Sequence, residues 1–172
     1  MPFSLTSVVV GTVLFALIAS AVQPSMNASD SARLETAAEE LSSLFRIAQA
    51  ESVRLETPHG VIFDANTKKF QVVIANTTNE PFTTLQTAYH PVRKQPLTWT
   101  PDAWISLTPI SGVFDYGIHG AAEQVMFDNW GTPLLTVAGV NRQLQTTNFT
   151  LATANETRTV TLFAVIGRVT VQ

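Results

Sequence analysis

The sequence predicts an α+β protein in which one long N-terminal helix, with a membrane-spanning half and an amphipathic half, packs on a C-terminal antiparallel β-rich head. Three observations support this prediction. The first 29 residues carry no Asp, Glu, Lys or Arg, and apolar residues then recur at intervals of three and four. After Gly60, short apolar runs with a period of two alternate with turn residues. The expected segments are residues 1–2, 3–29, 30–57 and 58–172.

Composition narrows the class of protein before any motif is considered. Only 13% of the 172 residues are charged, about half of the ~25% that is typical of soluble globular proteins. The net charge of −3 gives no electrostatic case for binding nucleic acid or anionic lipid. A chain that is 45% apolar is not intrinsically disordered, and without cysteine it forms neither a disulfide framework nor a thiolate zinc site.

The uncharged run from Phe3 to Val22 is long enough to form a transmembrane helix. Twenty residues at ~1.5 Å per residue span a ~30 Å hydrocarbon core, and the hydroxyls in the run can bond to a helix carbonyl one turn back. Two alternatives remain open. One is a secretory signal cleaved after Ala21, where Ala19-Ser20-Ala21 fits the A-x-A pattern although no basic residue precedes the apolar run. The other is a buried core helix of a soluble protein.

A second helical pattern follows Ser31. Its apolar side chains form one stripe opposite a charged face, and the stripe consists of Leu34, Ala37, Ala38, Leu41, Leu44, Phe45, Ala48 and Leu55. Pro24 is expected to kink the helix without ending it, whereas Thr57-Pro58 and Gly60 supply the stop. We therefore expect one helix from Phe3 to about Glu56. The side chains expected to cover one face of the sheet are Leu34, Leu41, Phe45 and Ala48.

The remainder of the chain reads as short strands separated by turns. The expected strands are 60–64, 69–75, 103–108, 123–127, 134–140, 149–153, 159–165 and 168–171. Turns are expected at 65–68, 128–133 and 166–168. The stretch 76–101, which contains four prolines, predicts a long surface loop. The three tryptophans are expected in the core; they are Trp99, Trp104 and Trp130.

No catalytic or metal-binding motif accompanies these elements. His59, His90 and His119 are far apart in the sequence and fit no metal-ligand spacing, so each is expected to be a surface or loop histidine. The sequence also has no nucleophile elbow and no phosphate-binding glycine loop. We therefore expect no enzyme activity, no metal and no cofactor.

The N-terminal residues carry a family resemblance. Phe3-Ser4-Leu5-Thr6, followed by an apolar helix and by Pro24 twenty-one residues after Phe3, resembles the mature N-terminus of type IV pilins and type II secretion pseudopilins. Further along, the chain is similar to H-type minor pseudopilins and FimT-like minor pilins, together GspH/FimT-like. The segments that carry this second similarity are Ala32 to Leu55, Phe127-Asp128 with Gly131-Thr132-Pro133, and Gly167-Arg168-Val169.

The resemblance implies a minor pilin-like structural subunit of a type II secretion or type IV pilus filament, which supports protein export or pilus assembly. Its implied partners are other pilin-like subunits, contacted through the N-terminal helices, and a prepilin peptidase that leaves Phe3 for methylation. The implied location is the bacterial inner membrane, with a single pass and the head in the periplasm. Nucleic acid is not an expected partner. The alternatives are a DNA-uptake or adhesive minor pilin, and a β-rich binding protein secreted after signal cleavage.

Two positions depart from the family pattern. Residues 1–2 stand where the family has a leader that ends in Gly, and they are interpreted as a remnant of such a leader. Ser7 stands where the family has Glu at the fifth mature position, a residue thought to neutralise the amino terminus of a neighbouring subunit. An uncompensated charge in a bilayer is costly. A subunit with Ser7 is therefore expected at a special position in the filament rather than in repeated stacking.

Overall fold

The computed structural model describes residues 5–75, 85–90, 92–109, 111–137 and 140–172, with side chains described from residue 30 onward except in 135–141. The chain divides into two compact units, Met1–Arg33 and Leu34–Gln172. One helix, α1 (Leu5–Leu55), begins in the first unit and ends in the second. The predicted single helix is therefore confirmed, and it continues through Pro24 as expected.

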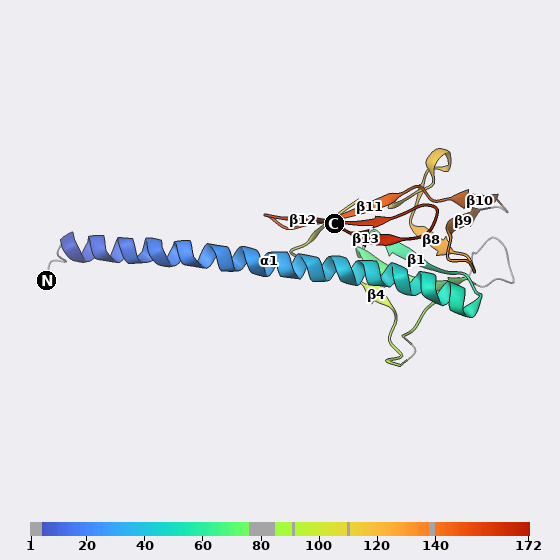
Figure 1. Cartoon of the computed structure of the whole chain (residues 1–172), viewed down its shortest axis with the longest axis horizontal. Helices are drawn as coiled ribbons and strands as arrows, with labels where there is room; N and C mark the ends of the chain where they lie inside the picture. Colours follow the sequence, from blue (N-terminus) through green and yellow to red (C-terminus); the bar gives the residue numbers. More distant parts are fainter. Residues whose placement is uncertain (1–4, 76–84, 91, 110, 138–139) are drawn as a thin grey trace. The chain divides into compact units, whose positions relative to one another are not determined.

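The larger sheet of the second unit is antiparallel and has the strand order β10-β9-β8-β1-β2-β3, with β4 also paired to β2 (Figure 1). Its strands β1 and β2 form the hairpin expected around residues 65–68. The bounds are β1 (His59–Asp64), β2 (Lys69–Ala75), β3 (Leu85–Thr87), β4 (Thr98–Trp99), β8 (Gln124–Phe127), β9 (Pro133–Val137) and β10 (Val140–Gln143).

A smaller antiparallel sheet has the order β13-β12-β11-β5, and a two-stranded hairpin completes the unit. The sheet consists of β5 (Ser106–Thr108), β11 (Thr147–Ala152), β12 (Thr157–Leu162) and β13 (Val169–Val171). The hairpin consists of β6 (Phe114–Asp115) and β7 (Ala121–Ala122), joined through the short 3₁₀ helix η1 (Gly117–His119). The predicted α+β class, with one N-terminal helix and an antiparallel β-rich part, is confirmed for the described residues.

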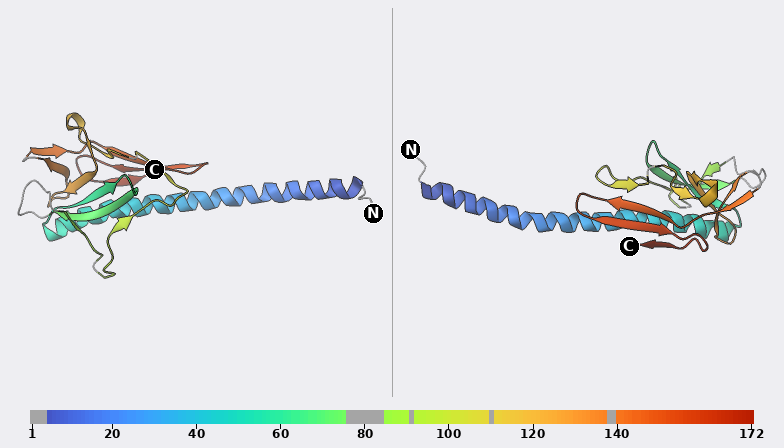
Figure 2. Two further views of the ribbon diagram at one scale, coloured as in Figure 1. Left: turned by 180° about the vertical axis from the view of Figure 1, so that it is seen from behind. Right: turned by 90° about the horizontal axis from the view of Figure 1, so that it is seen from above.

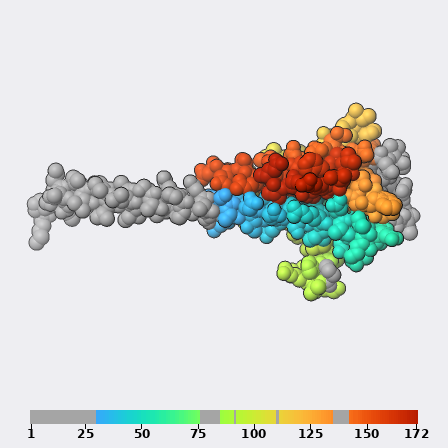
Figure 3. Space-filling view, in the orientation of Figure 1, coloured from blue at the N-terminus to red at the C-terminus, as the bar shows by residue number. Residues whose placement is uncertain are grey.

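Both sheets pack on the same stretch of α1. Figures 1 and 2 show β11, β12 and β13, in orange to red, beside the part of α1 coloured light blue to teal, and in Figure 3 the red atoms lie directly on the atoms of that part of the helix. The ring of Phe45 joins the layers, since it stacks on Phe149 of β11 with centroids 5.4 Å apart and meets Phe70 of β2 edge to face at 6.1 Å. Such ring pairs add ~0.5–1.5 kcal/mol each to the effect of area burial.

Two expected segments of the larger sheet differ from the structure. The stretch 76–101, expected as one loop, contains β3 and β4, which pair with the edge of β2 that does not face β1. Residues 76–84 of it lie outside the described residues. The expected strand 134–140 is instead the antiparallel pair β9 and β10. Strands of two or three residues held by backbone hydrogen bonds to an existing edge carry no period-two pattern, so the sequence does not reveal them.

Two strands of the smaller sheet are shorter than expected. The run 103–108 contributes only β5, because residues 103–104 form a turn. The run 159–165 ends at Leu162, where β12 gives way to the turn that contains Gly167. In both places the apolar run is longer than the strand and includes residues of a turn. Side-chain hydrophobicity does not show where the strand meets the turn, because that boundary is set by backbone hydrogen bonds.

Three side chains, those of Trp104, Trp130 and His59, lie where the sequence did not place them. Trp99 is buried as expected, but Trp104 is 39% exposed and Trp130 is 82% exposed. Both exposed tryptophans lie in turns, where backbone geometry rather than hydrophobicity sets the direction of the side chain. His59, expected at the surface, is only 2% exposed because it is the first residue of the central strand β1.

In the part of the chain that the structure describes, no helix combines the length and the apolar character needed to cross a membrane. The apolar run from Phe3 to Val22 begins within residues 1–4, which lie outside the described residues, and its side chains are likewise outside them.

Candidate functional site

The amphipathic stripe of α1 forms the seam between the helix and the two sheets. The structure places Leu34, Leu41, Phe45 and Ala48 in one core cluster with buried residues of both sheets, each with no exposed area. Full burial of a large apolar side chain contributes about 1.5–3 kcal/mol. The helix is therefore an integral part of the folded unit.

Polar links run along the edges of this seam. Trp99 donates its indole N–H to Glu40 at 3.2 Å, and Arg158 of β12 donates to Glu35 at 2.8 Å. Arg158 also lies 3.6 Å from Glu156, so this arginine is held between two carboxylates of its own chain. The hydrogen bond that Arg158 donates to Glu35 raises the pKa of Arg158.

Gln49 joins two turns that are far apart in the sequence. Its side-chain amide nitrogen donates to the carbonyl oxygen of Gly131 at 2.8 Å and to that of Ile166 at 2.9 Å. Gly131 lies in one of the two C-terminal segments that resemble minor pseudopilins, Phe127 to Pro133, and Ile166 directly precedes the other, Gly167 to Val169. The structure therefore brings both segments together on α1, at one residue.

Local chemistry explains the shape of the first turn. The carboxylate Oδ1 of Asp128 accepts hydrogen bonds from the backbone N–H of Trp130 at 2.9 Å and of Thr132 at 2.8 Å. Asp commonly closes a turn in this way. Gly131 has φ +78°, a conformation that residues with a side chain rarely adopt. The strong turn predicted for residues 128–133 is confirmed.

The second turn fits closely against the first. Gly167 has φ +60°, and a Cβ atom there would lie 2.8 Å from the carbonyl oxygen of Gly131 and 2.5 Å from the amide nitrogen of Gln49. Only glycine allows the two turns and the helix to approach this closely. The turn predicted around Gly167 is confirmed, and its glycine is needed for contact as well as for backbone conformation.

Large apolar side chains project from both turns at this junction. Trp130 precedes Gly131, and the exposed Val165 and Ile166 precede Gly167. Val53, one turn of α1 beyond Gln49, is also exposed and lies 3.2 Å from where a Cβ on Gly131 would stand. We call these four residues the junction patch. Large exposed apolar side chains gathered around one junction are typical of protein interaction sites.

The side chains of the predicted assembly motif lie outside the part of the chain that the structure describes. Phe3 and Ser4 lie outside the described residues, and the side chains of the remaining motif residues, Leu5, Thr6, Ser7 and Pro24, lie outside them as well. The three histidines are not brought together in any metal-binding group within the described part of the chain. His90 instead accepts backbone hydrogen bonds from Val92 and Arg93 through Nδ1.

Sequence reasoning did not single out Gln49. It lies beside the apolar stripe on a helix rich in polar residues, and nothing in the periodicity separates it from Gln23 or from the glutamates of the charged face. The sequence offers only an indirect indication. It contains two glycine-containing turns, each after a short apolar strand, and the backbone carbonyls of such turns need hydrogen-bond donors when they are buried.

No protein-family model matches this sequence, and no curated protein matches it. Solved structures do match. The minor pseudopilin EpsH from the type 2 secretion system of Vibrio cholerae is 12% identical, with a TM-score of 0.56, and the match covers 81% of this chain and 95% of that chain.

The type IV minor pilin FimU of Pseudomonas aeruginosa matches in two crystal forms, each 15% identical. The TM-scores are 0.49 and 0.47, and the matches cover 84% and 81% of this chain and 91% and 92% of those chains. The resemblance to pilins and pseudopilins that the sequence predicts is thus confirmed at the level of the fold: the chain folds like a minor pseudopilin.

Proposed function

We propose that this chain is a minor pilin-like subunit of a type II secretion or type IV pilus filament, with a structural role in protein export or pilus assembly. The observation that carries the proposal is the fold: a long N-terminal helix whose last turns pack on an antiparallel β-rich part, as in the minor pseudopilin EpsH. The N-terminal residues, read from the sequence, support it independently.

The first half of the helix is proposed to anchor the subunit in the bacterial inner membrane before assembly, with the β-rich part in the periplasm. Support comes from the uncharged apolar run Phe3 to Val22, which has the length of a bilayer span. In the filament, these side chains would exchange lipid for the helices of other pilin-like subunits. Prepilin peptidase is the proposed processing enzyme, and Phe3 the proposed N-methylated residue.

The decisive experiment is the mass and N-terminal residue of the protein recovered from cell membranes. The proposal expects a mature chain that begins at Phe3, carries one N-methyl group and stays in the membrane fraction. A chain that begins at Val22 and is found outside the membrane contradicts the filament role and favours a secreted β-rich protein.

The junction patch is the proposed contact between the β-rich part and a neighbouring subunit. Trp130 is its largest member, and large aromatic residues frequently dominate the energetics of protein interfaces. Trp130→Ala is expected to lower incorporation into sheared filaments at least threefold, measured by quantitative immunoblotting. Ile118→Ala is the matched control, because Ile118 is exposed on η1 rather than at the junction. Equal incorporation of the two variants contradicts the proposed contact.

Ser7 is proposed to restrict the subunit to a special position. Ser7→Glu would supply a counter-charge for a neighbour's amino terminus, and a desolvated ion pair is only marginally favourable, so a modest rise in incorporation is expected. The competing explanation is that Ser7 bonds a carbonyl one turn back and other contacts set the position. Unchanged incorporation of Ser7→Glu contradicts the role assigned to this residue.

A further inference from the structure

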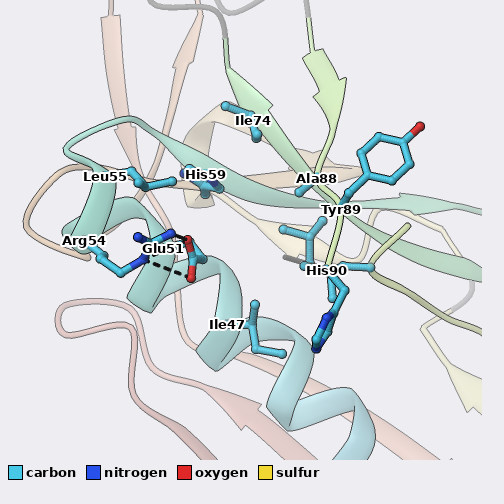
Figure 4. Close-up of a pocket in the computed structure, with 11 residues that line it drawn as sticks. Ile47, Glu51, Arg54, Leu55, His59, Ile74, Ala88, Tyr89 and His90 are labelled. Atoms are coloured by element: carbon cyan, nitrogen blue, oxygen red, sulfur yellow. Dashed lines mark hydrogen bonds and ion pairs between the residues drawn. The ribbon is translucent and has the colours of Figure 1, made fainter. Parts of the chain in front are cut away.

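A cavity of about 330 Å³ lies in the second unit, between the last turns of α1 and the larger sheet (Figure 4). Its apolar walls come from the helix, from β2 and from the chain that leads to β4. The residues that form these walls are Ile47, Leu55, Val72, Ile74, Ala88 and Leu97. A mainly apolar cavity of this size with a few polar groups is typical of a site for a small organic group.

One buried polar side chain in the lining lacks a full set of hydrogen bonds. His59 is 2% exposed, and its Nδ1 lies 2.7 Å from the carbonyl oxygen of Thr57. A carbonyl only accepts, so Nδ1 carries a proton and donates it. The second ring nitrogen, Nε2, has no hydrogen-bond partner among the described residues. Nε2 is not among the buried side-chain atoms that lack a partner in the described part of the chain, so it is open to the cavity and can accept a hydrogen bond from a group that enters it.

The charged residues of the lining do not offer a free charge. Arg54 donates to both carboxylate oxygens of Glu51 (Figure 4), and these hydrogen bonds lower the pKa of Glu51. The two side chains therefore stay ionised and neutralise each other at the edge of the cavity. A group that enters it is best matched when it is uncharged.

Apolar surface continues around the mouth of the cavity. Leu55 is 45% exposed and Tyr89 is 57% exposed, and the two lie on opposite sides of the lining in Figure 4. A free small molecule inside the cavity would leave both uncovered. A side chain that projects from a polypeptide would fill the cavity while its own backbone and neighbours cover the mouth.

We propose that this cavity binds a tyrosine side chain presented by another polypeptide, with the phenol hydroxyl hydrogen-bonded to Nε2 of His59. A hydroxyl donates to Nε2 of the neutral imidazole and accepts from it when the ring is protonated, so it pairs in both states. The indole N–H of tryptophan only donates, and phenylalanine has no polar group. The ring packs on the aliphatic walls. This binding site does not depend on the filament role proposed above.

The test uses the full chain in lipid nanodiscs with ¹³C-labelled isoleucine δ1 methyl groups, titrated with p-cresol and with toluene. Titration of nanodiscs without protein measures how much of each probe partitions into the lipid. The methyl signals of Ile47 and Ile74, which line the cavity, are expected to shift with probe, and that of the exposed Ile118 is expected to stay unchanged. One neutral hydrogen bond predicts about fivefold tighter binding of p-cresol than of toluene.

Two variants locate the binding. His59→Phe removes the acceptor and is expected to make the affinities for p-cresol and toluene equal. Ile47→Trp fills the cavity from the partly exposed side of α1 and is expected to abolish binding of both probes, whereas Ile118→Trp is the control that leaves binding intact. If His59→Phe does not fold, Ile47→Trp and the comparison of the two probes still decide the question.

Three results overturn the proposal. Ile47 and Ile74 signals that do not move at the highest soluble p-cresol concentration exclude the cavity as a site. Equal affinity of the native chain for p-cresol and toluene excludes the hydrogen bond to His59. Binding of p-cresol without binding of N-acetyltyrosinamide, in which the side chain is attached to a backbone, excludes a polypeptide as the source of the phenol.

Discussion

Two adjacent turns of α1 are held to the β-rich part in different ways. Phe45 contacts aromatic rings from both sheets and from the β6-β7 hairpin. Gln49, one turn later, makes two hydrogen bonds to turn carbonyls and lies partly exposed. Apolar burial provides most of the free energy of folding. Each hydrogen bond contributes only about 1 kcal/mol, but it forms only when donor and acceptor have the right distance and angle. The first contact stabilises the fold; the second fixes where two turns lie.

The largest effect is expected from a charge placed at the aromatic contact. Phe45→Asp, like Leu41→Asp, puts an unpaired carboxylate into a fully buried position, which costs several kcal/mol beyond the lost packing. We expect loss of the cooperative thermal transition in the chain from residue 30 onward, measured by circular dichroism. This chain contains the whole core cluster, which runs from Leu34 to Val169. A native melting curve for Phe45→Asp would show that the helix does not pack there.

A smaller but clear loss is expected where the two turns approach each other. Gly167→Ala adds a Cβ in a left-handed conformation and forces it against the backbone oxygen of Gly131, for a combined cost of about 3 kcal/mol. Gly117→Ala is the matched control: its φ of +62° is nearly the same, but the nearest atom to its Cβ would be 3.6 Å away. In urea titrations, we expect the control to lower the free energy of unfolding by about 1–2 kcal/mol. Equal losses in the two variants would rule out close contact at the junction.

Removing the Gln49 amide is expected to cost less again. Gln49→Met keeps the length of the side chain but leaves the carbonyls of Gly131 and Ile166 without their donor. We expect this to lower the free energy of unfolding by about 1–2 kcal/mol. Gln86→Met on β3, where the side chain is exposed, is the control and should stay within about 0.5 kcal/mol. Hydrogen exchange at Gly131 and Gly167 should accelerate only in Gln49→Met; unaltered exchange there would show that the amide does not hold the turns.

The difference between the two contacts also explains what the sequence could predict. A stripe with a period of three to four singles out Leu34, Leu41, Phe45 and Ala48, and the structure buries all four, because one face of a helix is a local property of the chain. The role of Gln49 depends on two turns 82 and 117 residues further along. No local pattern contains that information.

The same limit applies to the cavity and to the short strands. Burial of His59 follows from its position between β2 and β8, so it depends on a strand order that the sequence does not specify. The strands β3 and β4 exist because β2 leaves an edge unpaired, and two or three residues suffice to pair with it. Turn chemistry, in contrast, is local, and the turns at residues 128–133 and around Gly167 were predictable from their Asp and Gly residues.

The smallest effect is expected on the charged face of α1, beside the aromatic contact. Arg46 follows Phe45 directly, but its side chain is half exposed; it lies 3.5 Å from Glu39 and 3.4 Å from the carbonyl oxygen of Val169. Long contacts of an exposed side chain are weakened by water and salt, so Arg46→Ala should change the free energy of unfolding by no more than about 0.5 kcal/mol. The change should shrink further in 1 M NaCl, because salt screens the pair with Glu39. Urea titrations of Arg46→Ala and of the native chain at both ionic strengths measure this change. A loss well above about 0.5 kcal/mol that salt does not reduce would mean that this arginine stabilises the seam through packing of its aliphatic stem on β13.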